Sequence, residues 1–293
     1  MTLYTVRLEH PHFDCWREHA RQLLARRLPP EAVLFENGIG ERDLFADADT
    51  PLPDPSGAAL KPRLTHRALA QLERASRYCI EPQRECGWSL LYRVVWRLAL
   101  GEGEALLAGD TDGAELARRA RAVDHEAHHM HAFLRFQRRY REEDADSGPA
   151  FIAWFEPRHE VLADAAEHFI QRMGRHSWLI MTPRGAISCD GRAWHIERPA
   201  RQFCHDDYRA LLTLEDEGEA LWLAYYASTF NPSRVNEKCM RRSMPARFWQ
   251  HLPEQSLIAE LAGQARRGGR RSGQDRRLAG RHGRVIAAPR RDE

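Results

Sequence analysis

One central segment settles the fold class: Ser177-Trp-Leu-Ile-Met-Thr-Pro-Arg-Gly-Ala-Ile-Ser-Cys-Asp-Gly-Arg-Ala-Trp-His-Ile196. Its three short apolar runs lie at 177–182, 186–189 and 193–196. Pro183-Arg-Gly185 and Asp190-Gly191 separate the runs, and both separators are typical turn formers. Because turns this short favour antiparallel neighbours, the segment predicts a meander of three β-strands.

More strand and helix signals precede this meander. Residues 133–139 and 151–155 have strand-like composition, and an acidic turn at 142–149 joins them, which predicts a hairpin. Apolar residues at helical spacing then mark a helix that ends at Gly174: Leu162, Ala165, Phe169 and Met173. The order strand, strand, helix, strand, strand, strand predicts an α+β fold whose central antiparallel sheet is flanked by helices.

A long helix that begins at Asp112 is predicted before the sheet. Its apolar residues recur at i, i+4, i+7, i+11 and i+14, as Leu116, Ala120, Val123, Ala127 and Met130. Such a stripe predicts one buried face along the whole helix.

The same helix contains the H-E-x-x-H pattern of zinc metalloproteases, with His125, Glu126 and His129. At about 100° per residue, both histidines are expected opposite the apolar stripe and outside any walled pocket. The further metzincin positions hold Ala132 and Arg135 instead of Gly and His. A zinc hydrolase is therefore the least favoured alternative, and no metal site is predicted.

The N-terminal region has its own signals. Strands are expected at 5–8 and 33–35, with a helix at 14–27 capped by Asp14 between them, so that 1–46 forms a strand-helix-strand segment. Residues 47–62 are rich in proline and acidic residues and are interpreted as a linker. The main α+β domain is expected at 63–265, and it starts with helices at about 65–79 and 88–100.

The second of these helices is apolar on most of its surface, which predicts burial. Its aromatic residues Trp88, Tyr92 and Trp96 recur at every fourth position beside Arg93 and Arg97. They could form a stacking platform for unpaired bases. The favoured interpretation is core packing, with both arginines paired to acids.

The last folded part, from about Asp206, is expected to be helical and holds a dense group of basic residues. Asn231-Pro232 predicts a turn, and Pro245 can open a second short helix. Arg234, Lys238 and Arg241 fall at i, i+4 and i+7, so one helix face could present them to phosphates. The candidate nucleic-acid-binding residues are Asn231, Arg234, Asn236, Lys238, Arg241, Arg242, Arg247 and Trp249. Alternatively, the basic residues stabilise the domain through internal ion pairs.

The formal net charge of +2 is the sum of two unlike parts. Residues 266–293 hold ten arginines against three acids, which leaves the remainder of the chain acidic. This Gly-rich tail has no apolar periodicity, so disorder is predicted for 266–293. The tail is interpreted either as a nonspecific polyanion-binding arm or as a passive solubilising segment.

Several classes of protein leave no signal in the sequence. The chain has neither an apolar run of about 20 residues nor the apolar core of a signal peptide, so no membrane contact and a cytoplasmic location are expected. The six cysteines lack metal-ligand spacing. The phosphate-binding and dinucleotide-binding glycine motifs are missing, so no cofactor is predicted.

Several segments together resemble a bacterial family built on a domain of unknown function, DUF4130. The closing part 229–254 is similar to the family's F-N-P-x-R turn and M-P-x-x-W-x-x-L-P-E ending. Further similar segments follow the family's order at 16–33, 90–98, 128–136, 153–157 and 178–183. The resemblance covers about residues 3–262 and matches the form without the fused uracil-DNA-glycosylase-like domain.

The resemblance implies a function in DNA metabolism or DNA repair. It points to an accessory protein that binds DNA and works with a uracil-DNA-glycosylase-like or radical-SAM partner, with no catalytic activity expected of the chain itself. The alternative is a protein-interaction subunit that meets its partner enzyme without direct contact to DNA.

Overall fold

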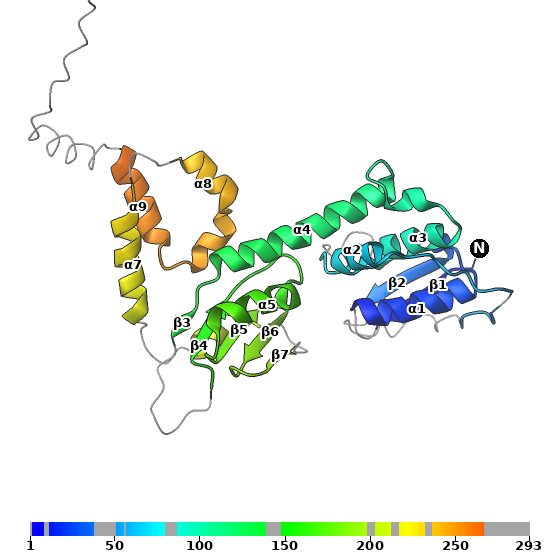
Figure 1. Cartoon of the computed structure of the whole chain (residues 1–293), viewed down its shortest axis with the longest axis horizontal. Coiled ribbons are helices and arrows are strands. Elements are labelled where there is room, and N and C mark those ends of the chain that lie inside the picture. Colours follow the sequence, from blue (N-terminus) through cyan, green and yellow to red (C-terminus); the bar gives the residue numbers. More distant parts are fainter. Residues whose placement is uncertain are drawn as a thin grey trace, which may run out of the picture.

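In a computed structural model of the chain, the described residues are 2–8, 12–37, 51–55, 57–79, 87–138, 148–197, 203–211, 217–231 and 236–266. The helix α4 (Thr111–Phe133) links two lobes, as Figure 1 shows. The N-terminal lobe contains the elements before α4 together with its first half. The C-terminal lobe contains the second half of α4 and everything after it.

The N-terminal lobe is built on two parallel strands, β1 (Tyr4–Leu8) and β2 (Val33–Asn37). The other elements of this lobe are α1 (Phe13–Ala25), η1 (Pro30–Ala32), α2 (His66–Ser76), α3 (Gly87–Ala99) and η2 (Gly103–Leu106). The predicted cap of α1 was wrong, because the helix starts earlier and the His12 side chain accepts the Cys15 N–H at 3.3 Å.

One apolar core spans the predicted boundary at 47–62. It joins Leu8 and Trp16 to Leu72, Leu91 and Leu116, which come from β1, α1, α2, α3 and α4. The linker prediction therefore does not coincide with a break between cores. Within 51–64, the described residues form neither helix nor strand.

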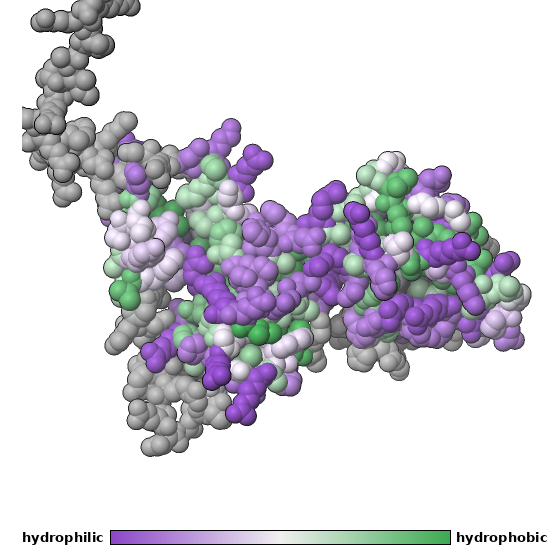
Figure 2. Space-filling model, viewed as in Figure 1, coloured by the Kyte–Doolittle hydropathy of each residue, from purple (hydrophilic) through white to green (hydrophobic). Residues whose placement is uncertain are grey.

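The predicted stripe of α4 is confirmed, since all five of its apolar residues are buried. Leu116 and Ala120 belong to the core of the N-terminal lobe, whereas Val123, Ala127 and Met130 belong to the core of the C-terminal lobe. Burial of one continuous stripe in two cores stabilises the helix and holds the lobes together. Hydrophilic residues lie along the visible face of α4 in Figure 2.

The predicted α+β class is confirmed by a five-stranded sheet with the order β3-β4-β5-β6-β7. Its strands are β3 (Gln137–Arg138), β4 (Phe151–Trp154), β5 (Trp178–Thr182), β6 (Gly185–Cys189) and β7 (Trp194–Glu197). Three of the four pairings are antiparallel, as expected, but β4 and β5 are parallel. The reason is that α5 (Leu162–Met173) lies between them as a crossover, which parallel neighbours require.

The prediction of a strand at 133–139 was largely wrong. The helix α4 continues through Phe133 because Met130 still packs into the core, and β3 retains only two residues. The pairing of β3 with β4 is antiparallel, as the hairpin prediction requires. The predicted turn at 142–149 lies mostly outside the described residues.

The sheet is covered on both faces. Successive strand residues point to opposite faces, so Ala153 and Phe155 face the core formed with α4 and α5. The alternate residues Ile152 and Trp154 pack instead with Tyr208 of α6 (His205–Leu211). Trp154 is therefore held between the sheet and α6.

The C-terminal helices continue from α6 as α7 (Glu217–Thr229), α8 (Glu237–Ser243), η4 (Ala246–His251) and α9 (Gln255–Arg266). The buried carboxylate of Glu254 accepts hydrogen bonds from Arg135 and Trp222. It thereby connects α7 and the start of α9 to the segment before β3. The predicted disordered tail lies outside the described residues, apart from Arg266. In the described ranges, every helix is too short or too polar to cross a bilayer.

Candidate functional site

The two short helices predicted for the closing segment are present as α8 and η4, whereas the predicted turn at 231–232 lies mostly outside the described residues. Asn236 caps α8, because its Oδ1 accepts the Cys239 N–H at 3.0 Å. Pro245 precedes η4, and Trp249 ties that turn back by donating from Nε1 to the Met244 carbonyl at 3.1 Å. Asn236 and Trp249 therefore shape the segment rather than present free polar groups.

Two of the predicted basic residues are solvent-exposed on α8. Lys238 and Arg242 are four residues apart, so they lie on one side of the helix. Neither side chain pairs with a carboxylate of a described residue. Asn231 is also exposed, whereas Arg234 and the side chain of Arg241 lie outside what the structure describes.

Arg247 does not belong to this exposed surface, which corrects its assignment to the predicted phosphate face. Its guanidinium donates to both oxygens of Glu126, at 2.8 and 2.5 Å. The Glu126 side chain is only 5% exposed and also accepts the Arg158 N–H at 2.7 Å. This bidentate pair anchors η4 to α4.

The surroundings of Glu126 favour the ionised form of its carboxyl group. Burial alone would raise its pKa, but the hydrogen bonds from Arg247 and Arg158 and the Arg247 charge outweigh burial and lower the pKa. The carboxylate is thus held as an anion between two donors. A general base in the H-E-x-x-H pattern would instead need a free lone pair aimed at a water molecule.

The expected position of the two histidines was wrong for His129. His125 is exposed, but His129 is buried beneath η4, with its ring centroid 5.1 Å from that of Phe248. The helical-wheel argument failed because η4 covers the side of α4 opposite the stripe. In the described part of the chain, no group of three metal-ligating side chains is arranged to hold an ion.

The aromatic ladder of α3 belongs to the core. Trp88 and Tyr92 are buried, and the Tyr92 hydroxyl donates to the Leu28 carbonyl at 2.6 Å. Arg93 and Arg97 are paired with acids, since Asp112 accepts from both and Asp110 accepts from Arg97. The ladder is therefore a packing element, as the favoured interpretation had it.

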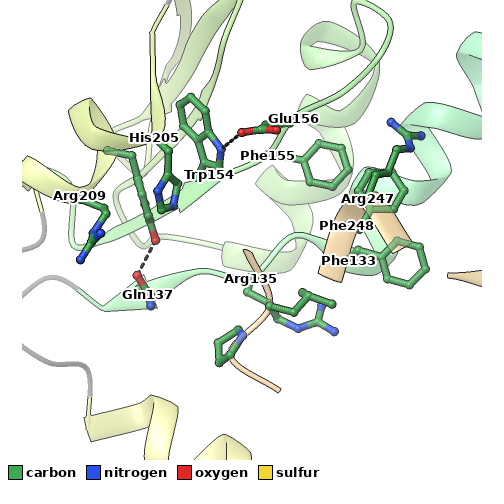
Figure 3. Close-up of a pocket in the computed structure, with 13 residues that line it drawn as sticks. Phe133, Arg135, Gln137, Trp154, Phe155, Glu156, His205, Arg209, Arg247 and Phe248 are labelled. Atoms are coloured by element: carbon green, nitrogen blue, oxygen red, sulfur yellow. Dashed lines mark hydrogen bonds between the residues drawn. The ribbon is translucent and has the colours of Figure 1, made fainter. Parts of the chain in front are cut away.

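A cavity of about 270 Å³ opens beside η4, between β4, α6 and the end of α4 (Figure 3). This is near the lower end of the range of small-molecule sites, about 300–1,000 Å³. Aromatic side chains dominate its lining: Phe133, Trp154, Phe155, His205, Tyr208 and Phe248. The other lining residues are polar or aliphatic: Arg135, Gln137, Glu156, Arg209, Arg247, Leu252 and Pro253.

Internal hydrogen bonds fix the polar groups of the cavity. The Trp154 indole donates to Glu156 at 3.0 Å, and the Tyr208 hydroxyl donates to Gln137 at 2.5 Å. Of the three arginines, Arg135 is paired with Glu254 and Arg247 with Glu126. Arg209 is exposed and pairs with no carboxylate of a described residue.

Sequence reasoning missed this cavity. Trp154 and Phe155 stood out only as part of the segments 151–155 and 153–157, and His205, Tyr208 and Arg209 were not singled out. One signal was available, because His205 and Arg209 are four residues apart at the start of a predicted helix. Nothing local indicates that α6 packs over β4.

The comparisons with known proteins give one match. No curated protein and no solved structure matches the chain. A family model described as a domain of unknown function, DUF4130, matches residues 85–254, which are more than half of the 293 residues and include α3, α4, the sheet and the cavity. The chain therefore belongs to the DUF4130 family.

Proposed function

We propose that this protein is a nucleic-acid-binding accessory factor of DNA repair or DNA metabolism. It holds DNA in the cytoplasm for a uracil-DNA-glycosylase-like or radical-SAM partner, and the partner performs the chemistry. The partner class and the repair context rest on the family resemblance. Contact with DNA rests on the C-terminal lobe.

The observation that carries the proposal is the pair of exposed cations on α8. Lys238 and Arg242 stand on one helix side without a described acidic partner. A phosphate can therefore approach them without first displacing an internal carboxylate. Cations of this kind bind the nucleic-acid backbone regardless of sequence and release its counterions.

The test is a salt titration of duplex DNA binding by fluorescence anisotropy. The double variant Lys238→Ala/Arg242→Ala removes two phosphate contacts. Each contact contributes about 0.9 to the slope of log affinity against log salt, so the slope is expected to fall by about 2. Affinity at low salt is expected to fall with it.

A matched control is available in the N-terminal lobe. The double variant Lys61→Ala/Arg67→Ala also removes one lysine and one arginine, both exposed, but far along the chain from α8. It should leave the slope unchanged. Equal slopes for the two double variants, or DNA binding that does not respond to salt, would remove α8 as the contact surface.

A second candidate is a protein-interaction subunit, and a specific feature of α7 favours it. Leu221 and Tyr225 are 73% and 58% exposed and lie one turn apart on that helix. Large apolar side chains exposed together are typical of contact surfaces between proteins. A Leu221→Ser/Tyr225→Ser variant that keeps DNA binding but no longer co-purifies with a partner enzyme would support this function.

A further inference from the structure

Two groups of aromatic side chains, one from each side of β4, form the walls of the cavity beside η4. Trp154 and His205 lie on one side in Figure 3, and Phe155 and Phe248 lie on the other. Phe155 and Phe248 are stacked, with ring centroids 5.1 Å apart and planes inclined by 15°. A cavity lined by aromatic rings in this way favours a flat aromatic ligand.

These walls are rigid. Trp154, Phe155 and Phe248 are all buried, and the hydrogen bond from Trp154 to Glu156 fixes the indole. On the α6 side, Tyr208 is held by Gln137, and its ring is inclined by 41° to that of His205, with the centroids 5.4 Å apart. The cavity is therefore formed before a ligand arrives, which lowers the entropy cost of binding.

Among the arginines that line the cavity, Arg209 differs from the other two because it has no carboxylate partner among the described residues. Arg209 follows Tyr208 on α6 and is exposed, whereas Arg135 and Arg247 are committed to Glu254 and Glu126. Its five N–H donors suit a phosphate. The cavity thus combines an aromatic interior with a guanidinium at the edge.

We propose that this cavity takes one unpaired nucleotide, with the base between the aromatic walls and its phosphate on Arg209. This inference deepens the proposed function and rests on it, because it assigns the unpaired base to a DNA strand. A base inside a duplex has both faces covered by its neighbours, so only an unpaired or extruded base presents its faces to such walls. A free mononucleotide offers the same chemistry.

The experiment compares three probes: a deoxynucleoside monophosphate, a single-stranded oligonucleotide and a fully paired duplex of the same length. The wild-type chain is expected to prefer the single strand over the duplex. Arg209→Ala should reduce single-strand affinity by about tenfold and leave duplex affinity almost unchanged. Arg172→Ala, which removes an exposed arginine of α5 outside the cavity, is the matched control.

Intrinsic fluorescence gives a second readout that does not depend on Arg209. Trp154→Phe keeps an aromatic ring in the wall but removes the indole, and a thermal melt checks its folding. If a base stacks on Trp154, the nucleotide-induced quenching of the wild type is lost in this variant. Quenching that persists unchanged in folded Trp154→Phe would overturn the proposal.

The results for the cavity variants can be distinguished from the results for the α8 double variant. Equal single-strand affinities for Arg209→Ala and Arg172→Ala overturn the cavity assignment even when the α8 variants behave as expected. Mononucleotide binding without any preference for single strands overturns the assignment to a DNA strand and points to a free nucleotide. Loss of salt-dependent duplex binding in the α8 double variant, with single-strand preference retained, supports both proposals.

Discussion

The two lobes differ in what their arginines do. In the N-terminal lobe, Arg97 is bound by three carboxylates, those of Glu102, Asp110 and Asp112, and Arg93 shares the last of them. The interactions with Arg97 lower the pKa of Asp110 to about 2. These charges are satisfied within the lobe, which leaves them unsuited to bind an external anion.

The basic residues of the C-terminal lobe fall into two groups, paired and unpaired. Arg135 and Arg247 are paired with the buried carboxylates of Glu254 and Glu126, whereas Arg209, Lys238 and Arg242 are exposed without a described acidic partner. The paired residues position the segment 236–254, and the unpaired ones face solvent from it or from α6. These unpaired cations of the C-terminal lobe are the ones that the proposed anion binding uses.

The largest effect is expected from removing the anchor of η4. Glu126→Ala leaves Arg247 without its bidentate partner and leaves the Arg158 N–H without an acceptor. Loss of one member of a buried pair costs about 3–5 kcal/mol. Urea denaturation at neutral pH measures the change in the free energy of unfolding.

The N-terminal lobe offers the control for this prediction. Glu18 on α1 pairs with Arg21, but both side chains are about two-thirds exposed, at 60% and 63%. Solvent screening limits such a pair to less than about 1 kcal/mol, so Glu18→Ala should be almost neutral. Similar losses for both variants would show that Glu126 is no more important to the fold than a surface residue.

Local patterns predicted the parts of the fold that depend on helix periodicity. The five apolar residues of the α4 stripe are all buried, and α5 ends at Gly174, where the backbone has a φ of 58° that suits glycine. The paired state of Arg93 and Arg97 was also anticipated, because an arginine on a buried helix must find an acid nearby. These features are encoded within a few turns of chain.

Contacts between distant residues could not be predicted in this way. Glu126 and Arg247 are 121 residues apart, and only the packing of η4 on α4 brings them together. The burial of His129 has the same cause, and the placement of Tyr208 against β4 likewise depends on the packing of α6. The cavity is lined by four segments that are distant in the sequence, so no single stretch of sequence could predict it.

One glycine with a positive φ in each lobe allows a comparison of how much a Gly→Ala substitution destabilises that lobe. Gly191, in the turn between β6 and β7, and Gly101, after α3, have φ values of 89° and 93°. A Cβ at Gly191 would lie 2.3 Å from the Arg175 carbonyl oxygen, whereas a Cβ at Gly101 meets nothing within 4 Å. Gly101→Ala should therefore cost only the left-handed backbone, about 1 kcal/mol.

Gly191→Ala adds a backbone clash to that cost, and about 2–3 kcal/mol is expected. Thermal unfolding of the two variants side by side measures the difference. Equal losses would mean that the chain near Arg175 yields readily, and the C-terminal lobe would then be less rigid than its packing indicates.

The smallest expected effect is a difference between the lobes in their stability at acidic pH. Burial lowers the pKa of His129, His131 and His159, and all three lie in the C-terminal lobe. The charge of His125 lowers the pKa of His129 further, and Arg247 adds to this, against an opposing contribution from Glu126. The unfolded chain therefore binds more protons than the fold below the ordinary histidine pKa of about 6.5.

Stability is consequently expected to fall as the pH drops from 7.5 to 5.5. The amide protection factors, which correct for the slower intrinsic exchange in acid, should fall in the second half of α4 before they do so in α1 to α3. Asp110 and Glu115 in the N-terminal lobe, with pKa values of about 2, stay ionised throughout this range. His129→Gln removes one titrating group and should reduce the pH dependence, whereas His66→Gln, at the exposed start of α2, should not. If the protection factors fall equally in both lobes, the lobes unfold as one unit through α4. If the two variants respond alike, burial of His129 does not set the acid response.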